Sequence, residues 1–176
     1  LSDGKVYENK KTLKVNLKKL KYEQRQLSKK KKGSVGSKKQ KNKLAKVHEK
    51  VKNIRRDYLH KVSTEIVKNH DEICIEDLAV KNMMKNHKLS QAFSDVSLGT
   101  FYTMLEYKAN WNDKVIVKID RFFPSSKTCN VCNYINQDLT LKDREWTCKS
   151  CNTVHDRDFN ASININQDGS SNRVGN

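Results

Sequence analysis

The chain has 176 residues, of which 36 are Lys or Arg and 20 are Asp or Glu, and its formal net charge is +16. This length suits one medium-sized domain with a small addition. It contains neither a secretory leader nor an apolar run near the ~20 residues of a membrane span. We therefore expect a protein of a reducing, cytoplasmic compartment with no membrane partner.

The positive charge is concentrated in the first third of the chain. Between Lys10 and Lys61 there are 21 Lys or Arg and three acids, a net +18, so the remaining residues sum to −2. Such a dense excess of one sign favours a polyanionic partner, most commonly nucleic acid. The alternative is a helical surface whose charges are simply solvated.

The first residues predict a turn. Asp3-Gly4 stands between Leu1-Ser2 and the strand-like run Lys5-Val6-Tyr7-Glu8, and Asp-Gly is a strong hairpin signal. Only two residues remain of the strand that should precede this turn. We therefore expect the chain to begin inside a sheet.

Two amphipathic helices are expected next, from Thr12 to about Leu27 and from about Leu44 to Val67. Residues 29–43 carry Lys, Gly and Ser without an apolar stripe, which is typical of a connector. The pattern predicts an antiparallel helical hairpin with a positive outer surface. The apolar stripes consist of Leu13, Leu17, Leu20 and Leu27 in the first helix and of Leu44, Val47, Val51, Ile54, Tyr58, Val62 and Ile66 in the second.

β-Branched residues indicate two buried strands, over residues 73–78 and 115–119. The first strand ends in the adjacent carboxylates Glu76 and Asp77, as is typical of the C-terminal edge of a parallel sheet. A loop over 81–92 and a helix lie between the strands. That helix is expected to begin at Ser94 or Asp95 and to bury Leu98, Phe101, Leu105 and Ala109.

The cysteines Cys129 and Cys132 form one C-x2-C pair, and Cys148 and Cys151 form another, with 15 residues between the pairs. Two such turns present four sulfurs to one tetrahedral Zn²⁺ ion. Disulfides or a redox pair are the alternatives, and a reducing compartment disfavours both. His155 is an alternative ligand. A ribbon over residues 125–155 has few apolar residues, so we expect the ion to hold it folded.

Glu76 and Asp158 are candidate ligands for a catalytic divalent cation. Mg²⁺ prefers carboxylate oxygens from separate elements, and two ions ~3.5–4 Å apart can promote hydrolysis of a phosphodiester. Each residue has an alternative role. Glu76 could be a surface or ion-pair residue, and Asp158 could be the N-cap of a helix that begins near Asn160. That helix is expected to end at residue 166, before a disordered tail over 167–176.

Four motifs in order resemble the C-terminal half of the TnpB (OrfB) transposon proteins. They are Ile75-Glu76-Asp77-Leu78, then Asp120-Arg121-Phe122-Phe123-Pro124 with the first cysteine pair, then Arg144-Glu145-Trp146-Thr147 with the second pair, and His155-Asp156-Arg157-Asp158-Phe159-Asn160-Ala161. The resemblance extends to about residue 166. The family consists of RNA-guided DNA nucleases with a RuvC-type, ribonuclease-H-like domain, related to the smallest type V CRISPR effectors.

The resemblance implies an α/β fold, namely a truncated ribonuclease-H-like (RuvC) domain with a basic helical hairpin and an inserted four-cysteine zinc ribbon. Residues 1–124 would be the RuvC-like part, with the hairpin at about 12–68. Residues 125–155 would be the ribbon and 156–166 the last RuvC segment. DNA and a guide RNA are the implied partners, and the location would be nucleoid-associated.

Carried over onto this sequence, the resemblance implies that Glu76 is the second RuvC carboxylate and Asp158 the third, with Asp156 as the alternative. Mg²⁺ would be the catalytic cofactor and Zn²⁺ the structural one. Arg144 matches a family arginine near the scissile phosphate, although packing or a surface ion pair would also explain it. The hairpin would bind phosphates through Lys18, Lys21, Arg25, Lys29, Lys30, Lys38, Lys39, Arg55 and Arg56.

The first catalytic aspartate of the family lies just upstream of the segment that matches Leu1. We therefore expect no nuclease activity from these 176 residues alone. A second hypothesis is a non-catalytic zinc-ribbon module that binds nucleic acid, as a remnant or a regulator. A third is a ribbon used for protein contacts. The sequence leaves the oligomeric state open.

Overall fold

The computed structural model describes residues 1–83, 85, 96–140 and 142–174. The chain forms two compact units. The helical unit comprises Glu8–Ile66 and Val80–Lys108, and the sheet unit comprises Leu1–Tyr7, Val67–Ala79 and Ala109–Asn176. Among the described residues, no helix is both long enough and apolar enough to cross a membrane.

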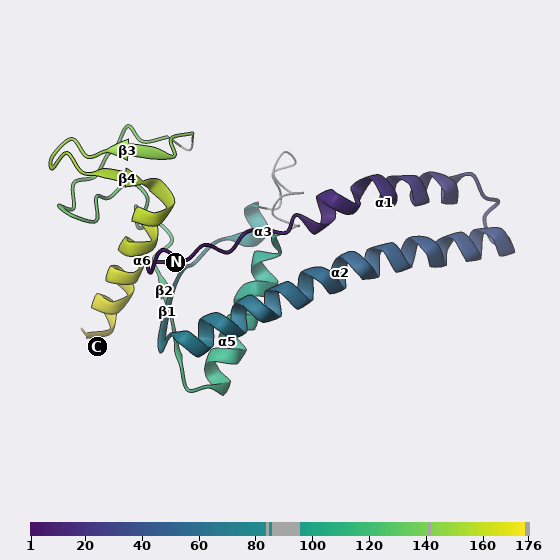
Figure 1. Ribbon diagram of the computed structural model, residues 1–176, viewed down its shortest axis with the longest axis horizontal. Coiled ribbons are helices and arrows are strands. Elements are labelled where there is room, and N and C mark those ends of the chain that lie inside the picture. Colours follow the sequence, from purple (N-terminus) through teal and green to yellow (C-terminus); the bar gives the residue numbers. More distant parts are fainter. Residues whose placement is uncertain (84, 86–95, 141, 175–176) are drawn as a thin grey trace. The chain divides into compact units, whose positions relative to one another are not determined.

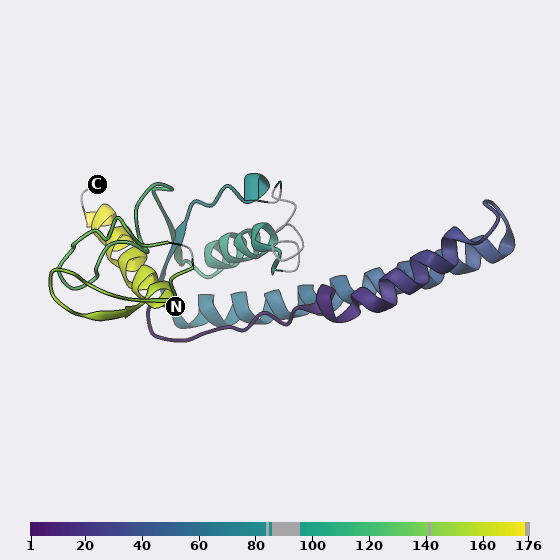
Figure 2. The same cartoon turned by 90° about the horizontal axis from the view of Figure 1, so that it is seen from above.

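The helical unit is built on a long antiparallel pair, α1 (Thr12–Ser28) and α2 (Val35–Asn69), which lie side by side in Figures 1 and 2. Leu20 of α1 is buried, as are several apolar residues of the predicted α2 stripe. The buried Gln40 side chain of α2 donates to the Glu23 backbone carbonyl and to its carboxylate, at 3.2 and 2.5 Å. The predicted helical hairpin is therefore present, and this polar contact joins α1 to α2.

The connector between these helices is much shorter than expected, because α2 begins at Val35 and not at about Leu44. Ser34 caps the helix: its hydroxyl accepts from the Ser37 N–H at 3.1 Å, and its carbonyl accepts from the Lys38 N–H at 3.0 Å. Serine at this position satisfies backbone donors that a helix start leaves without partners. Lys38 and its neighbour Lys39 therefore lie on the first turns of a helix.

This unit also contains α3 (Val80–Met83) and, through Lys108, α5 (Leu98–Trp111). The predicted loop over 81–92 is thus helical through Met83. Apart from Lys85, the remainder of that loop lies outside the described residues, as do the predicted caps Ser94 and Asp95. Leu105 and Ala109 of α5 are buried as expected, whereas Leu98 and Phe101 are only half-buried. The Lys108 ammonium ties α5 to α2, since it donates to the His60 carbonyl and to the hydroxyls of Ser63 and Thr64 at 2.7–2.8 Å.

The sheet unit contains a parallel pair of strands, β1 (Glu72–Glu76) and β2 (Val115–Ile119), paired in register from Glu72 with Val115 to Glu76 with Ile119. Both strands were predicted, although β1 ends at Glu76 and not at Leu78. The helix α6 (Arg157–Val174), yellow in Figure 1, packs on both strands. The unit is therefore of the α/β class, with the carboxylate end of β1 beside the exit of β2.

The predicted turn at the start of the chain is present, since the Gly4 N–H donates to the Leu1 carbonyl at 3.1 Å and Gly4 has φ = 83°. Glycine suits this left-handed conformation. Residues 5–8, which were predicted to be strand-like, are described as irregular and form no strand.

The tail predicted over 167–176 is helical through Val174 because α6 continues across the strands. Ser170 of α6 donates to the Glu72 carboxylate at 2.9 Å. Gly169 is buried against β1, where a Cβ atom would overlap Cys74 Sγ and lie 3.0 Å from Cys74 Cβ. The small residue allows α6 and β1 to approach closely. These contacts with β1 stabilise the part of α6 that follows its predicted end at residue 166.

Gly169→Ala is expected to destabilise the protein even though it replaces glycine within a helix. Alanine normally gains ~1 kcal/mol in a helix interior, whereas forcing atoms into a packed contact costs about 1–3 kcal/mol. The steric cost should prevail and lower the free energy of unfolding measured by urea titration. Cys74→Ala in the same chain should recover most of the loss, because it removes the overlapping sulfur. A neutral or stabilising Gly169→Ala would contradict this packing.

Candidate functional site

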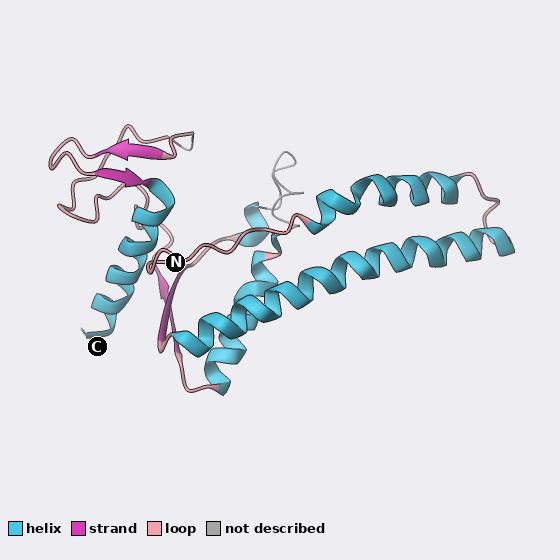
Figure 3. Ribbon diagram, in the orientation of Figure 1, coloured by secondary structure: helices cyan, strands magenta, loops and turns pink. Residues whose placement is uncertain are grey.

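The four cysteines converge in a small ribbon whose antiparallel strands β3 (Glu145–Thr147) and β4 (Val154–Asp156) are drawn in magenta in Figure 3. The four Sγ atoms lie within 4.8 Å of one another. Two of the S–S distances are 3.6 Å, close to the ~3.8 Å edge of a tetrahedron whose corners lie about 2.3 Å from a central Zn²⁺. The number, chemistry and spacing of these donors fit one tetrahedral zinc ion.

The two cysteine turns have the same backbone. The N–H groups of Cys129 and Cys148 donate to the carbonyls five residues later, at 2.8 and 2.9 Å. Asn133 and Asn152, each directly after a C-x2-C pair, adopt left-handed φ angles of 61° and 58°. Asn tolerates this conformation better than most residues. This repeated turn was not predicted, and a Cys-Asn step at the end of each pair is its sequence signal.

Without a metal ion, the surrounding protein groups give Cys129 and Cys151 different pKa values. Burial raises the pKa of Cys129 to about 11, whereas hydrogen bonds from the Thr153 side chain and backbone lower that of Cys151 to about 6. At neutral pH, Cys129 therefore needs a cation to become a thiolate. A bound Zn²⁺ would provide that charge, because coordinating thiols lose their protons.

His155 lies beside the sulfur cluster as a hydrogen-bond partner of one ligand. Its Nε2 is 3.1 Å from Cys129 Sγ, and its ring lies 4.8 Å, centroid to centroid, from that of Trp146. Burial lowers the pKa of His155. The neutral ring can donate from Nε2 to a Cys129 thiolate, as partners behind metal ligands commonly do. This contact explains the position of His155 beside the cluster as that of a hydrogen-bond partner of Cys129, so His155 is not needed as a metal ligand.

The adjacent carboxylates at the end of β1 have different partners. Glu76, which is half-buried, accepts a hydrogen bond from the Ser125 hydroxyl at 2.7 Å. Asp77 accepts from the Arg121 guanidinium at 2.5 Å, and the same side chain bonds the Asp77 carbonyl at 2.9 Å. Asp77 therefore joins the ends of the two parallel strands, while Glu76 faces the base of the ribbon.

Asp158 stands in the first turn of α6 and is 64% exposed. Arg157 donates to its Oδ1 from Nε and Nη2 at 3.1 and 3.0 Å, and Arg144 Nη1 lies 3.4 Å from its Oδ2. Arg144 is thus a surface ion-pair partner of Asp158, one of the roles that the sequence left open. Exposed pairs of this kind are weak, about 0–1 kcal/mol, so the guanidinium can readily exchange partners.

Asp156, the alternative to Asp158, has a structural role. Its Oδ1 accepts from the Phe159 N–H at 2.7 Å, the bond expected of an N-cap residue directly before α6. Asp158 is therefore not the N-cap, because the helix begins at Arg157 and not near Asn160. Of the two carboxylates, Asp156 therefore caps the helix and Asp158 does not.

Two buried asparagines, which sequence reasoning missed, fasten α6 to the base of the ribbon. Asn160 and Asn164, one turn apart, are 1% and 3% exposed. Each side chain donates from Nδ2 to the Thr128 carbonyl at 2.7 Å. Each also donates to the Ser125 carbonyl, at 3.5 Å in the case of Asn160 and at 2.7 Å in the case of Asn164. Asn160 also accepts from the Asn130 N–H at 3.1 Å. Ser125 therefore links the Glu76 side chain to the helix that carries Asp158.

Asn164→Ala is expected to lower the free energy of unfolding by about 1–3 kcal/mol, because it removes two buried hydrogen bonds worth about 0.5–1.5 kcal/mol each. The Ser125 and Thr128 carbonyls then keep only the donor of Asn160. Asn166→Ala is a matched control, since Asn166 is exposed on the same helix. Urea titration of both variants would measure the difference. Equal stabilities for the two variants would rule out a fastening role for Asn164.

All nine predicted nucleic-acid-binding residues lie on the helical unit. Eight of them are exposed, and Arg55 is half-buried. The nine residues therefore belong to one unit, whereas Glu76, Asp158 and the four cysteines belong to the sheet unit.

Comparisons with known proteins match nearly all of the chain. A family described as "Probable transposase" (OrfB of the IS605 type) matches residues 1–87, and one described as "Cas12f1-like, TNB domain" matches residues 99–165. A relative from Streptomyces pristinaespiralis, named for an RNA-guided DNA endonuclease activity, is 45% identical over 165 residues, covering 94% of this chain and 41% of its own length. InsQ of Escherichia coli K12, which bears the same kind of name, is 34% identical, with 94% and 44% covered.

A solved complex of Cas12f1 with guide RNA and target DNA resembles this fold with a TM-score of 0.57 at 21% sequence identity. The likeness covers 87% of this chain and 41% of that one. The chain thus spans about two-fifths of the length of these three proteins. Together with the ordered motifs, these matches show that the chain belongs to the TnpB (OrfB) family of transposon-encoded proteins.

Proposed function

We propose that this chain is the RuvC-like and zinc-ribbon part of an RNA-guided DNA endonuclease. The helical unit would bind nucleic acid, and the sheet unit would contribute carboxylates to phosphodiester hydrolysis. The observation that carries the proposal is the chain of hydrogen bonds from half-buried Glu76 through Ser125 to Asn160, which connects a strand-end carboxylate to the helix of Asp158. The names of the relatives support the same activity.

The chemistry requires hard oxygen ligands, and the carboxylates of Glu76 and Asp158 provide them. When bound, Mg²⁺ would supply charge stabilisation and a more acidic water. Ser125 holds the Glu76 carboxylate by a hydrogen bond at 2.7 Å, which restricts its rotamer. The Arg144 guanidinium, 3.4 Å from Asp158 and largely exposed, can exchange this weak pair for a phosphate oxygen.

Cleavage can be tested in a chimera, in which this chain replaces the matched segment of the Streptomyces pristinaespiralis relative. With a guide RNA and Mg²⁺, the chimera is expected to cut a matching DNA duplex. A folded, zinc-loaded chimera that binds its RNA but leaves the DNA intact would favour the second candidate, a non-catalytic nucleic-acid-binding module. The two arginines beside Asp158 are the observation that favours this candidate, because they already balance its charge.

Nucleic-acid binding by the helical unit can be tested on the 176-residue chain itself. Lys18, Lys21 and Arg25 are exposed cations of α1. Replacing all three by Ala should reduce the slope of log K against log salt by about 0.9 for each lost contact with duplex DNA. Fluorescence anisotropy over a salt series would measure this slope.

The matched control removes three exposed cations of the sheet unit, Lys118, Lys142 and Lys149. This variant should retain most of the wild-type salt slope. Equal slopes for the two triple variants would show that the helical unit is not the phosphate-binding surface.

A further inference from the structure

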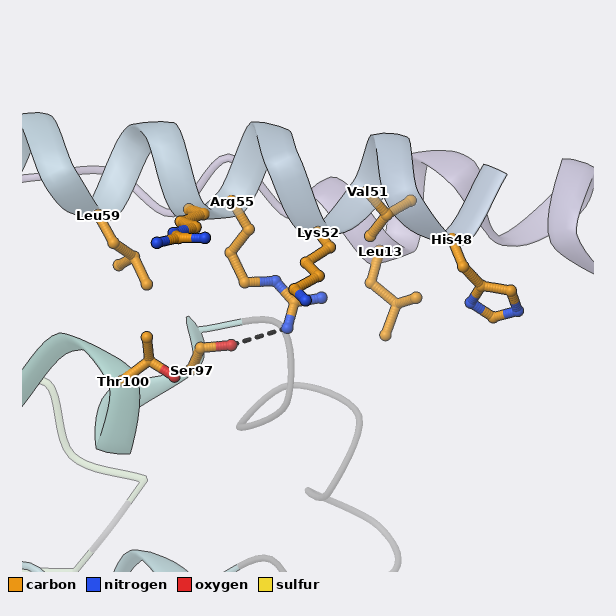
Figure 4. Close-up of a pocket in the computed structure, with 9 residues that line it drawn as sticks. Leu13, His48, Val51, Lys52, Arg55, Leu59, Ser97 and Thr100 are labelled. Atoms are coloured by element: carbon orange, nitrogen blue, oxygen red, sulfur yellow. Dashed lines mark hydrogen bonds between the residues drawn. The ribbon is translucent and has the colours of Figure 1, made fainter. Parts of the chain in front are cut away.

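The helical unit contains a cavity of about 370 Å³ between α1, α2 and the start of α5. This volume is within the ~300–1,000 Å³ range of small-molecule sites. The lining side chains are shown in Figure 4, where Arg55 and Leu59 of α2 point toward Ser97 and Thr100. The cavity is lined by Leu13, His48, Val51, Lys52, Arg55, Arg56, Leu59, Ser97 and Thr100.

The lining divides into an apolar floor and a cationic rim. Val51 and Leu59 are 4% and 7% exposed and, with Leu13, form the apolar part. Lys52 and Arg56 are exposed, and none of the nine described residues that line the cavity is acidic. The site therefore offers positive charge at its edge and a hydrophobic surface inside it.

Arg55 is held in place at the centre of this site. Its Nη1 donates to the Ser97 hydroxyl at 2.7 Å, the dashed line in Figure 4. The contact joins α2 to the residue directly before α5 and orients the planar guanidinium across the cavity. An oriented guanidinium binds phosphate oxygens in pairs and also stacks on planar rings. Binding of phosphate oxygens suits the phosphate of a nucleotide, and stacking on planar rings suits its base.

We propose that this cavity is a binding site for a single nucleotide of single-stranded nucleic acid. The phosphate contacts Lys52, Arg55 and Arg56, and the base lies against Leu13, Val51 and Leu59. Unstacked bases of single strands are available for such insertion, whereas bases within a duplex are not. The proposal rests on the proposed nucleic-acid-binding function, and it adds a defined nucleotide pocket to a surface otherwise expected to bind phosphates by charge alone.

The test uses the zinc-loaded 176-residue chain and three probes, namely adenosine 5′-monophosphate, adenosine and inorganic phosphate, followed by ¹H–¹⁵N NMR titration. The monophosphate should bind at least about tenfold more tightly than either part, because it fills both halves of the site. Deoxyadenosine monophosphate distinguishes an RNA-type from a DNA-type nucleotide. Shifts should centre on Val51, Arg55 and Ser97.

Two variants address the site directly. Lys52→Gln should weaken the monophosphate about tenfold by removing one charged phosphate contact, whereas Lys50→Gln removes the same charge from the same helix outside the cavity and should change binding less than twofold. Thr100→Phe keeps every cation but fills the space, and it should abolish monophosphate binding. Thr100 is exposed, so the fold should tolerate this change.

Several results would overturn the proposal: equal effects of Lys52→Gln and Lys50→Gln, unchanged monophosphate binding in Thr100→Phe, or phosphate binding as tightly as the nucleotide. Titration with an eight-nucleotide RNA and DNA separates this proposal from the broader one. If the chain binds the oligonucleotides but shows no shifts with adenosine monophosphate, the nucleotide pocket is rejected and nucleic-acid binding by the helical unit is retained. Absence of both would reject nucleic-acid binding by the helical unit.

Discussion

In the chimera, Glu76→Gln and Asp158→Asn are each expected to reduce Mg²⁺-dependent DNA cleavage by about a thousandfold or more, because each removes an anionic ligand of the proposed metal site. Both substitutions preserve side-chain size, so folding should be little affected. Single-turnover cleavage with radiolabelled DNA would measure the rate. RNA binding by each variant, measured in parallel, should remain at the level of the unchanged chimera.

Asp156→Asn is the matched control for Asp158→Asn, since both remove one charge at the start of α6. Asn caps helices about as well as Asp, so the bond from the Phe159 N–H should persist and cleavage should continue. Loss of cleavage in Asp156→Asn with retention in Asp158→Asn would exchange the roles of the two residues. Retention in both Glu76→Gln and Asp158→Asn would reject the proposed metal site.

Removal of zinc is expected to unfold the ribbon. Structural zinc sites of this type contribute apparent binding free energies of about 10–16 kcal/mol near neutral pH, far more than the local apolar cluster of Leu139 and Trp146 can supply. A chelator should therefore expose Trp146, which is 7% exposed in the fold, and shift its fluorescence to longer wavelength. Trp111, already 75% exposed, should contribute little to the change.

Cys148→Ser tests the same site without a chelator. The purified variant should lose bound zinc, whereas the wild-type chain should contain one zinc ion, measured by atomic emission. Cys74→Ser is the control, because Cys74 lies on β1 outside the sulfur cluster. One zinc per chain in Cys148→Ser, or an unchanged Trp146 spectrum after complete zinc removal, would show that the ribbon folds without the ion.

Local sequence pattern was sufficient for much of this fold. The strand at Val115–Ile119, the first helix and the four-cysteine cluster follow from β-branched runs, apolar periodicity and Cys spacing, all of which act over a few residues or through one ion. The identity of the family was equally accessible, because its motifs are short and ordered along the chain.

Tertiary structure decided the features that depend on distant contacts. The helix α6 continues to Val174 because Gly169 fits against Cys74, a contact across 95 residues that no local propensity encodes. The capping role of Asp156 and the fastening role of Asn160 likewise depend on which backbone groups the fold brings near them. Burial makes these polar contacts matter, since a buried carbonyl or N–H without a partner is costly, and burial is a property of the assembled chain.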